Sequence, residues 1–154
     1  MSLADPAVNR EIANVRGIST ERIAVGDAEI NVLTGGGGPP VLLLHGYPQT
    51  HVIWHKVAPL LASKLMLVIP DLPGYGASKG PAPDPANQNY SKRNIARLLA
   101  ALMSLLGHEK FAVAGHDRGG ASGFGWRSII PIESSPSHPW TSFRRSMPGK
   151  TWIG

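Results

Sequence analysis

The sequence predicts an α/β fold built on a mostly parallel sheet. Two observations support this class: short apolar runs alternate with longer amphipathic runs over residues 21–120, and turns rich in glycine and proline separate them. The 154 residues, of which 42% are hydrophobic and 16% charged, are enough for one globular domain and too apolar for a disordered chain.

The first elements predict a small meander followed by a buried strand. Residues 22–26 and 29–33 alternate polar and apolar side chains, as two half-buried strands do. Glycines and prolines over 35–40 predict a turn, and the continuously apolar run 41–45 is typical of a strand buried on both faces. Apolar residues at helical spacing then predict a helix over 50–63, which Pro59 shortens or kinks.

The next elements are a strand, a helix and a third buried strand. Residues 65–69 form the strand, and after a loop Ser91 is a candidate N-cap. The helix ends near Gly107, and residues 111–114 form the last strand. One helical face carries the apolar stripe that we expect to be buried: Ile95, Leu98, Leu99, Leu102, Leu105 and Leu106.

The strand over 111–114 runs into a Gly-x-Asp-x-Gly sequence with small residues where a helix should begin. Such a sequence is typical of a nucleophile elbow, in which the central residue has a strained backbone and the flanking glycines allow the strand and the helix to approach closely. The central residue here is Asp117; the alternative is that it only caps a helix. The surrounding motif consists of Gly115, His116, Arg118, Gly119 and Gly120.

Two further motifs follow the two earlier buried strands. His45, Gly46, Tyr47 and Pro48 come directly after the first of them, where an elbow enzyme places one backbone donor of its oxyanion hole. Residues 71–78, with two glycines, leave the second strand and could be an ordinary turn. Three motifs at three successive strand ends favour a catalytic site.

In this order, the motifs over residues 22–120 resemble the α/β-hydrolase superfamily, and within it the branch with an aspartate nucleophile, which contains epoxide hydrolases, haloalkane dehalogenases and haloacetate dehalogenases. Residues 89–93 are similar to the start of the helix before the elbow in haloacetate dehalogenases. The resemblance implies that Asp117 is the nucleophile, that the backbone N–H groups of Tyr47 and Arg118 form the oxyanion hole, and that the other motif residues are structural. It also implies a small-molecule substrate.

The chemistry follows from the residue types. An aspartate carboxylate is ionised at pH 7 and can attack an sp³ carbon without a base, giving an alkyl ester. Water must then cleave that ester with the help of a histidine base, which in this family is oriented by a carboxylate. The chain has six histidines, and we expect none of them to be this base: His45, His51, His55, His108, His116 and His138. We also expect no cap over the site, and therefore an inactive chain.

Arg118 indicates the substrate. A guanidinium beside the nucleophile can clamp a carboxylate bidentately, and haloacetate dehalogenases have an arginine at this position. Epoxide hydrolases usually have a tryptophan there, so Arg118 favours a halogenated carboxylic acid as the substrate, with an epoxide as the alternative. If Arg118 has no role in binding, it forms a surface ion pair. Ala121 and Ser122 follow the elbow where haloacetate dehalogenases show a second arginine.

The composition changes abruptly near Gly120. Leu and Val together number 24 in residues 1–120 and none in residues 121–154, where Ser, Pro and Gly make 15 of 34 residues. We therefore expect an N-terminal extension (1–20), the N-terminal portion of a hydrolase fold (21–120) and an irregular tail (121–154). A shift of reading frame near codon 120 explains the break; the alternative is a short protein that kept the half-fold as a binding module.

Several function classes are excluded or disfavoured. The chain has no cysteine, which excludes disulfides and thiolate metal sites, and we expect no cofactor and no metal. The net charge of +5 does not indicate nucleic-acid binding, because residues 1–120 hold 11 basic against 9 acidic residues. Residues 1–10 contain no apolar signal segment, so we expect a soluble, cytoplasmic protein without a membrane partner.

Overall fold

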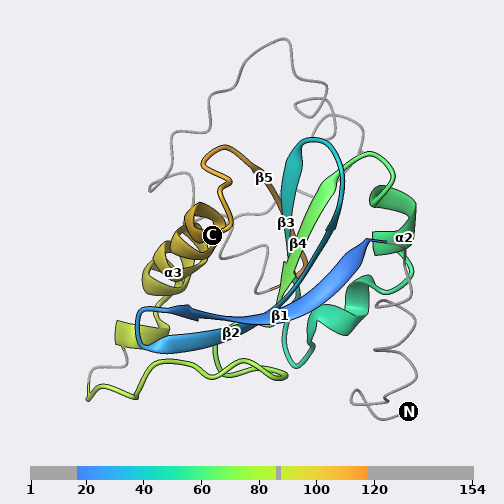
Figure 1. The fold of residues 1–154 in the computed structure, drawn as a ribbon. Helices are drawn as coiled ribbons and strands as arrows, with labels where there is room; N and C mark the ends of the chain where they lie inside the picture. Colours follow the sequence, from blue (N-terminus) through green and yellow to red (C-terminus); the bar gives the residue numbers. More distant parts are fainter. Residues whose placement is uncertain (1–16, 86–87, 118–154) are drawn as a thin grey trace, which may run out of the picture.

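The computed structural model describes residues 17–85 and 88–117, and these form a sheet with helical segments on both faces (Figure 1). The five strands lie in the order β1-β2-β4-β3-β5. Their bounds are β1 Ile18–Val25, β2 Ala28–Gly36, β3 Pro40–Leu44, β4 Met66–Pro70 and β5 Ala112–Gly115. The predicted meander and the three later strands are all present.

The sheet is mostly parallel, as expected. β3 pairs in parallel with both β4 and β5, while β2 pairs antiparallel with β4 and with β1. β1 therefore runs in the same direction as β3, β4 and β5, so that four of the five strands share one direction. The predicted α/β class is confirmed. β1 begins three residues before the domain start expected at residue 21.

The helix predicted over 50–63 is present only as two short pieces. A 3₁₀ helix, η1, covers His51–Trp54, with the Thr50 hydroxyl accepting a hydrogen bond from the Val52 N–H, and α2 covers Ala58–Leu61. Pro59 lies in the first turn of α2, where its missing N–H costs nothing, but it could not continue a helix arriving from residue 50. The break near Pro59 is therefore stronger than a kink.

The longer helix, α3, covers Lys92–Leu105 and has caps at both ends. The Ser91 side chain accepts from the Asn94 N–H, as expected of an N-cap. At the other end Gly107 has φ +80°, and the N–H groups of Gly107 and His108 donate to Ser104 and Met103, which is a Schellman motif. A glycine at this position is favoured because other residues rarely adopt positive φ. A short 3₁₀ helix, η2 (Gln88–Tyr90), precedes α3.

Side chains alternate between two buried layers on the sheet, one facing α3 and the other facing α2, which lie on opposite sides of it (Figure 1). In β3, Leu42 and Leu44 join the layer that includes α3, whereas Val41 and Leu43 join the layer that includes α2. A strand buried on both faces has this continuously apolar sequence because neither face needs polar residues.

Two sequence expectations about burial are wrong. Leu105 is 63% exposed, whereas the stripe of α3 is buried through Ala96, Leu99, Leu102 and Met103. Leu105 lies on the outer side of the last turn, because its neighbour Leu106 is the residue that packs against the buried layer. β5 is mostly exposed rather than buried, because among the described residues it pairs on one side only, with β3.

The expected extension (1–20) and tail (121–154) lie largely outside the described residues. Among the residues that the structure does describe, no helix is both long enough and apolar enough to cross a bilayer.

Candidate active site

Three loops meet at one edge of the sheet because β3, β4 and β5 are parallel and end there. β3 leads into residues 45–49, β4 into residues 71–78, and β5 into His116 and Asp117. The chain passes from β3 to β4 on one side and then to β5 on the other side of β3. Ligands of open α/β sheets bind beyond the carboxyl ends of strands at such a reversal.

Asp117 lies in a sharp turn at the end of β5. Its φ is +51°, and it is the only residue other than glycine with a positive φ among the described residues. The Tyr47 backbone N–H donates to the Asp117 Oδ2 with an N···O distance of 3.0 Å, although 70 residues separate the two in the sequence. A carboxylate thus lies on an exposed turn, with one oxygen held by a backbone amide from a neighbouring strand end.

Gly46 lets the two loops approach. A Cβ atom at this position would lie 2.7 Å from the Asp117 Cβ and 2.9 Å from the His116 carbonyl oxygen. Backbone atoms at these distances cannot be displaced cheaply, so any larger residue would separate Tyr47 from Asp117. The 46–49 turn contains a cis Tyr47–Pro48 peptide and is closed by a hydrogen bond from the Gln49 N–H to the Gly46 carbonyl, at 2.9 Å.

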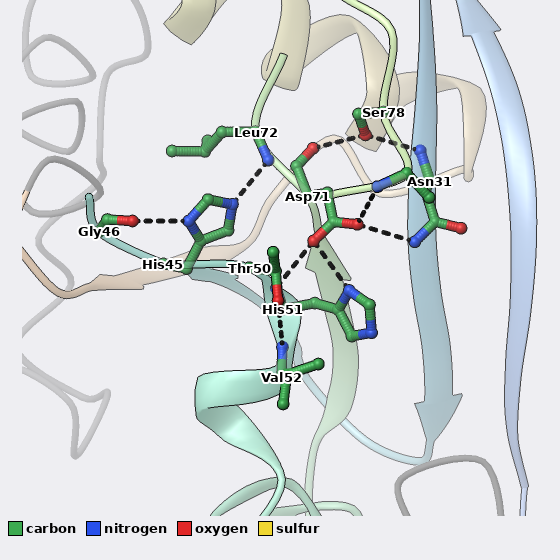
Figure 2. Close-up of polar contacts among 10 residues, drawn as sticks. Asn31, His45, Gly46, Thr50, His51, Val52, Asp71, Leu72 and Ser78 are labelled. Atoms are coloured by element: carbon green, nitrogen blue, oxygen red, sulfur yellow. Dashed lines mark hydrogen bonds and ion pairs between the residues drawn. The ribbon is translucent and has the colours of Figure 1, made fainter. Parts of the chain in front are cut away.

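His45 joins the end of β3 to the end of β4 (Figure 2). The Leu72 N–H donates to His45 Nε2 at 2.9 Å, so Nε2 carries no proton, and Nδ1 donates to the Gly46 carbonyl at 2.9 Å. Burial lowers the pKa of His45, outweighing the Gly46 hydrogen bond and the Asp71 charge, which act in the opposite direction. His45 is therefore a neutral structural link, since both ring nitrogens are engaged.

Asp71, which is fully buried, is the centre of a second network (Figure 2). Its Oδ1 accepts from the His51 N–H and from His51 Nδ1, both at 2.8 Å, and its Oδ2 accepts from Asn31 Nδ2 and the Ala77 N–H, both at 3.0 Å. The Ser78 hydroxyl adds a bond to the Asp71 carbonyl at 2.8 Å. Four donors on one carboxylate hold β2, β4 and the start of η1 together.

The charge of Asp71 is stabilised within the protein. Burial is the largest influence and acts to raise the pKa of Asp71, but the hydrogen bond and charge of the His51 ring, with the N–H groups of His51 and Ala77, bring it below the ordinary 3.8. Because its oxygens are all occupied and no part of it is exposed, Asp71 supports the site rather than reacting with a ligand.

These two groups predict how stability depends on pH. The folded pKa of His45 lies below its ordinary 6.5, so its contribution is complete above pH 6.5 and is lost as the pH falls towards the folded value. The folded pKa of Asp71 lies below 3.8, so a second loss begins as the pH falls below 3.8. Urea unfolding from about pH 8 to about pH 3 should show the free energy of unfolding falling in both windows.

A matched pair of variants tests the first window. His45→Gln should remove most of the decline that begins below pH 6.5, because glutamine does not titrate. His108→Gln, at a partly exposed histidine after α3, should leave the decline in place. An unchanged slope in His45→Gln would contradict the assignment.

The remaining histidines have other partners or lie elsewhere. His51 binds Asp71, His55 Nδ1 bonds the Val52 carbonyl at 2.9 Å, and His116 Nδ1 lies 3.2 Å from Gln49 Oε1. His108 precedes β5 and so lies towards the opposite edge of the sheet. Arg118, Gly119, Gly120 and His138 lie outside the described residues.

Sequence reasoning missed several supporting residues. The sequence singles out neither Asn31 nor Gln49, includes Ser78 only as the end of the 71–78 loop, and offers His51 only as a helical residue that is not the base. One sequence feature pointed to this network, namely the two glycines of the Asp71–Ser78 loop. In the structure Gly76 is needed there, because a Cβ at this position would collide with the Asp71 carboxylate. Across the described part of the chain, no group of three or more potential ligands could hold a metal ion.

A family model described as the alpha/beta hydrolase fold matches residues 39–126, more than half of the chain. The chain belongs to the α/β-hydrolase family. The match includes all three strand-end loops and extends past the composition break at Gly120. The Asp117 turn at the end of β5 lies within the matched residues.

Known members of the family are similar to the chain over part of their length. A fluoroacetate dehalogenase from Burkholderia sp. is 48% identical over 107 residues, which are 70% of this chain and 35% of the relative. A soluble epoxide hydrolase from Corynebacterium sp. (strain C12) is 36% identical over 107 residues, 70% of this chain and 36% of the relative. The chain thus spans about a third of the length of these two relatives.

A solved structure gives the same result for the fold. A protein of Nostoc sp. PCC 7120 that was assigned to the α/β hydrolases matches with a TM-score of 0.73 and 46% identity, covering 76% of this chain and 40% of the other. The chain therefore shares the α/β-hydrolase fold with that protein over about two fifths of the other protein's length.

Proposed function

We propose that Asp117 is the nucleophile of a hydrolase that acts on halogenated carboxylic acids. The observation that carries this proposal is the 3.0 Å hydrogen bond from the Tyr47 N–H to Asp117 Oδ2, made in a turn where Asp117 has φ +51°. A residue that only caps a helix has no need of a positive φ or of an amide donor from another strand end.

The first step is a displacement at an sp³ carbon. With Oδ2 held by the Tyr47 N–H, the other oxygen, Oδ1, attacks the carbon next to the substrate carboxylate. The new O–C bond forms as the carbon–halogen bond breaks, and the halide leaves with the bonding electron pair. The product is an ester of Asp117, and no proton transfer is needed because the carboxylate is already an anion.

The amide donor acts again in the second step. Oδ2 becomes the carbonyl oxygen of the ester and stays against the Tyr47 N–H, to which the Arg118 N–H would add a second donor. When water attacks the Asp117 carbonyl carbon, negative charge develops on this same oxygen, where preorganised donors stabilise it. Cleavage returns the aspartate and releases a 2-hydroxy acid and a proton.

The substrate class rests on Arg118 and on the relatives. A guanidinium next to the nucleophile can bind a substrate carboxylate by two parallel hydrogen bonds. The 48% identity to a fluoroacetate dehalogenase agrees with this choice. An epoxide is the second candidate because a soluble epoxide hydrolase is 36% identical over the same length; the same Asp117 attack would then break a C–O bond of the ring, and the ring oxygen would keep the electron pair and take a proton from water.

We further propose that the ester persists in this chain. Hydrolysis requires a histidine that can take a proton from water beside Asp117. Both ring nitrogens of His45 are engaged. The other three rings are held at places that serve other contacts: His51 at Asp71 in the buried network, His55 at the Val52 carbonyl, and His116 at Gln49. In the described part of the chain, none of them is placed for this task, so the reaction should stop after one event per molecule.

Fluoroacetate is the most informative substrate, because its strong C–F bond resists ordinary nucleophiles and background alkylation is slow. The folded chain should gain the mass of one carboxymethyl group and release one equivalent of fluoride, while a small epoxide adds more slowly. Faster addition of the epoxide would favour the second candidate, and fluoride beyond one equivalent would contradict the persistence of the ester. An unchanged mass in a cooperatively folded sample would favour the binding-module alternative.

A further inference from the structure

Gln49 connects the two loops that form the proposed site. Its Oε1 lies 3.1 Å from the Gly46 backbone N and 3.2 Å from His116 Nδ1, so one side-chain atom contacts the end of β3 and the end of β5. Gly46 and His116 are the immediate neighbours of Tyr47 and Asp117. The Gln49 backbone N–H also donates to the Gly46 carbonyl, so both ends of the 46–49 turn are held by this residue.

The partners determine the direction of both hydrogen bonds. A backbone N–H can only donate, so the group facing Gly46 must be the amide oxygen of Gln49 and not its NH₂. The same oxygen faces His116 Nδ1, which must therefore carry a proton. The structure thus specifies both the orientation of the Gln49 amide and the protonated nitrogen of His116.

We propose that Gln49 is a positioning residue that fixes the distance between the Tyr47 N–H and the Asp117 carboxylate. The His116 backbone N–H is bound to the Leu44 carbonyl at 3.0 Å, which anchors β5 to β3 up to this residue. Beyond it, the side-chain bridge through Gln49 is the next link between the strands before the Tyr47–Asp117 contact. The effect of Gln49 on ester formation rests on the proposed function, whereas the Gln49 bridge itself can be measured without substrate.

A purely structural role for Gln49 makes a different prediction. If Gln49 only filled space beside Ile53 and Trp54, with which it lines an open cavity of about 260 Å³, a side chain of equal length without a strong acceptor would serve equally well. Gln49→Met is that variant, because methionine matches the length and shape of glutamine. Gln49→Glu is the matched control, because a carboxylate retains an acceptor for both donors.

Nitrogen NMR of the His116 ring and hydrogen exchange of the Gly46 and Tyr47 amides measure the bridge directly. At alkaline pH, where imidazoles are neutral, His116 should carry its proton on Nδ1 in the unmodified chain and in Gln49→Glu. In Gln49→Met the ring should shift towards the Nε2–H form, and the two amides should exchange faster. A wild-type ring with its proton on Nε2, or exchange unchanged in Gln49→Met, would overturn the proposal.

The rate of ester formation with fluoroacetate supplies the functional readout. It should fall about 10- to 100-fold in Gln49→Met, less than the 10²–10³ expected for deleting an oxyanion donor, because the Tyr47 N–H is displaced and not removed. Gln49→Glu should restore most of the rate. An equal loss in both variants would overturn the positioning role. If the wild-type chain forms no ester while the NMR results hold, the proposed function fails and the bridge stands.

Discussion

Asp117→Asn should abolish ester formation from fluoroacetate, lowering its rate on the order of 10⁴-fold or more, as removal of a covalent nucleophile does. The amide has no anionic oxygen to attack the carbon. It does keep an oxygen that can accept from the Tyr47 N–H, so the 3.0 Å contact between the loops can persist. Time-resolved intact mass of the wild type and the variant measures the difference.

The variant is also its own control for folding. Asp117 is exposed and asparagine tolerates positive φ, so the free energy of unfolding should change by no more than about 0.5 kcal/mol. Ester formation at an undiminished rate in Asp117→Asn would show that another group is alkylated and would remove the basis of the proposed mechanism.

Asp71→Ala should have the largest effect on stability, lowering the free energy of unfolding by about 3–5 kcal/mol. The substitution leaves two donors from His51 and one from Asn31 without an acceptor in a buried environment. The N–H of Ala77, an exposed residue, also loses its acceptor. Small domains are stable by only about 5–15 kcal/mol, so this single change would remove a large part of the total. Urea unfolding measures it.

Asp84→Ala is the matched control for Asp71. The Asp84 carboxylate also accepts backbone hydrogen bonds, from Gln88 at 3.0 Å and Asn89 at 2.7 Å, but it lies on a loop with access to water. Solvent can replace a lost partner there, so the cost should be that of a helix cap, about 0.5–2 kcal/mol. Equal losses in the two variants would contradict the role assigned to the buried network.

The fold was predictable from sequence where the local pattern is determined by burial. β3 and β4 are continuously apolar because both their faces are covered. The two caps of α3 are short-range motifs that can be recognised from Ser91 and Gly107 in the sequence. The segment over 50–63 was harder, because the same apolar spacing fits one helix or two short pieces. In the structure the 3₁₀ helix η1 begins at His51, whose ring is held by Asp71, and such a contact between distant residues is not visible in the local sequence.

The site was predictable only in part, for a physical reason. The strand-end motifs are local, and topology alone brings Tyr47 and Asp117 to one edge of the sheet. The supporting contacts join residues far apart in the chain, such as Asn31 with Asp71 and Gln49 with His116, and a single sequence carries no pattern for such pairs. The expectation that Leu105 is buried was wrong because the apolar spacing does not fix the exact orientation of the helix, and the face that packs carries Leu102, Met103 and Leu106 instead.

The central claim is that Asp117 attacks the substrate, and peptide mapping after incubation with fluoroacetate in heavy-oxygen water tests it most directly. We expect one carboxymethyl ester on Asp117. If the ester is cleaved, heavy oxygen should appear in the Asp117 carboxylate, since water attacks its carbonyl carbon. A cooperatively folded sample that releases fluoride with neither mark on Asp117, or that leaves fluoroacetate intact, would show that Asp117 is not the nucleophile.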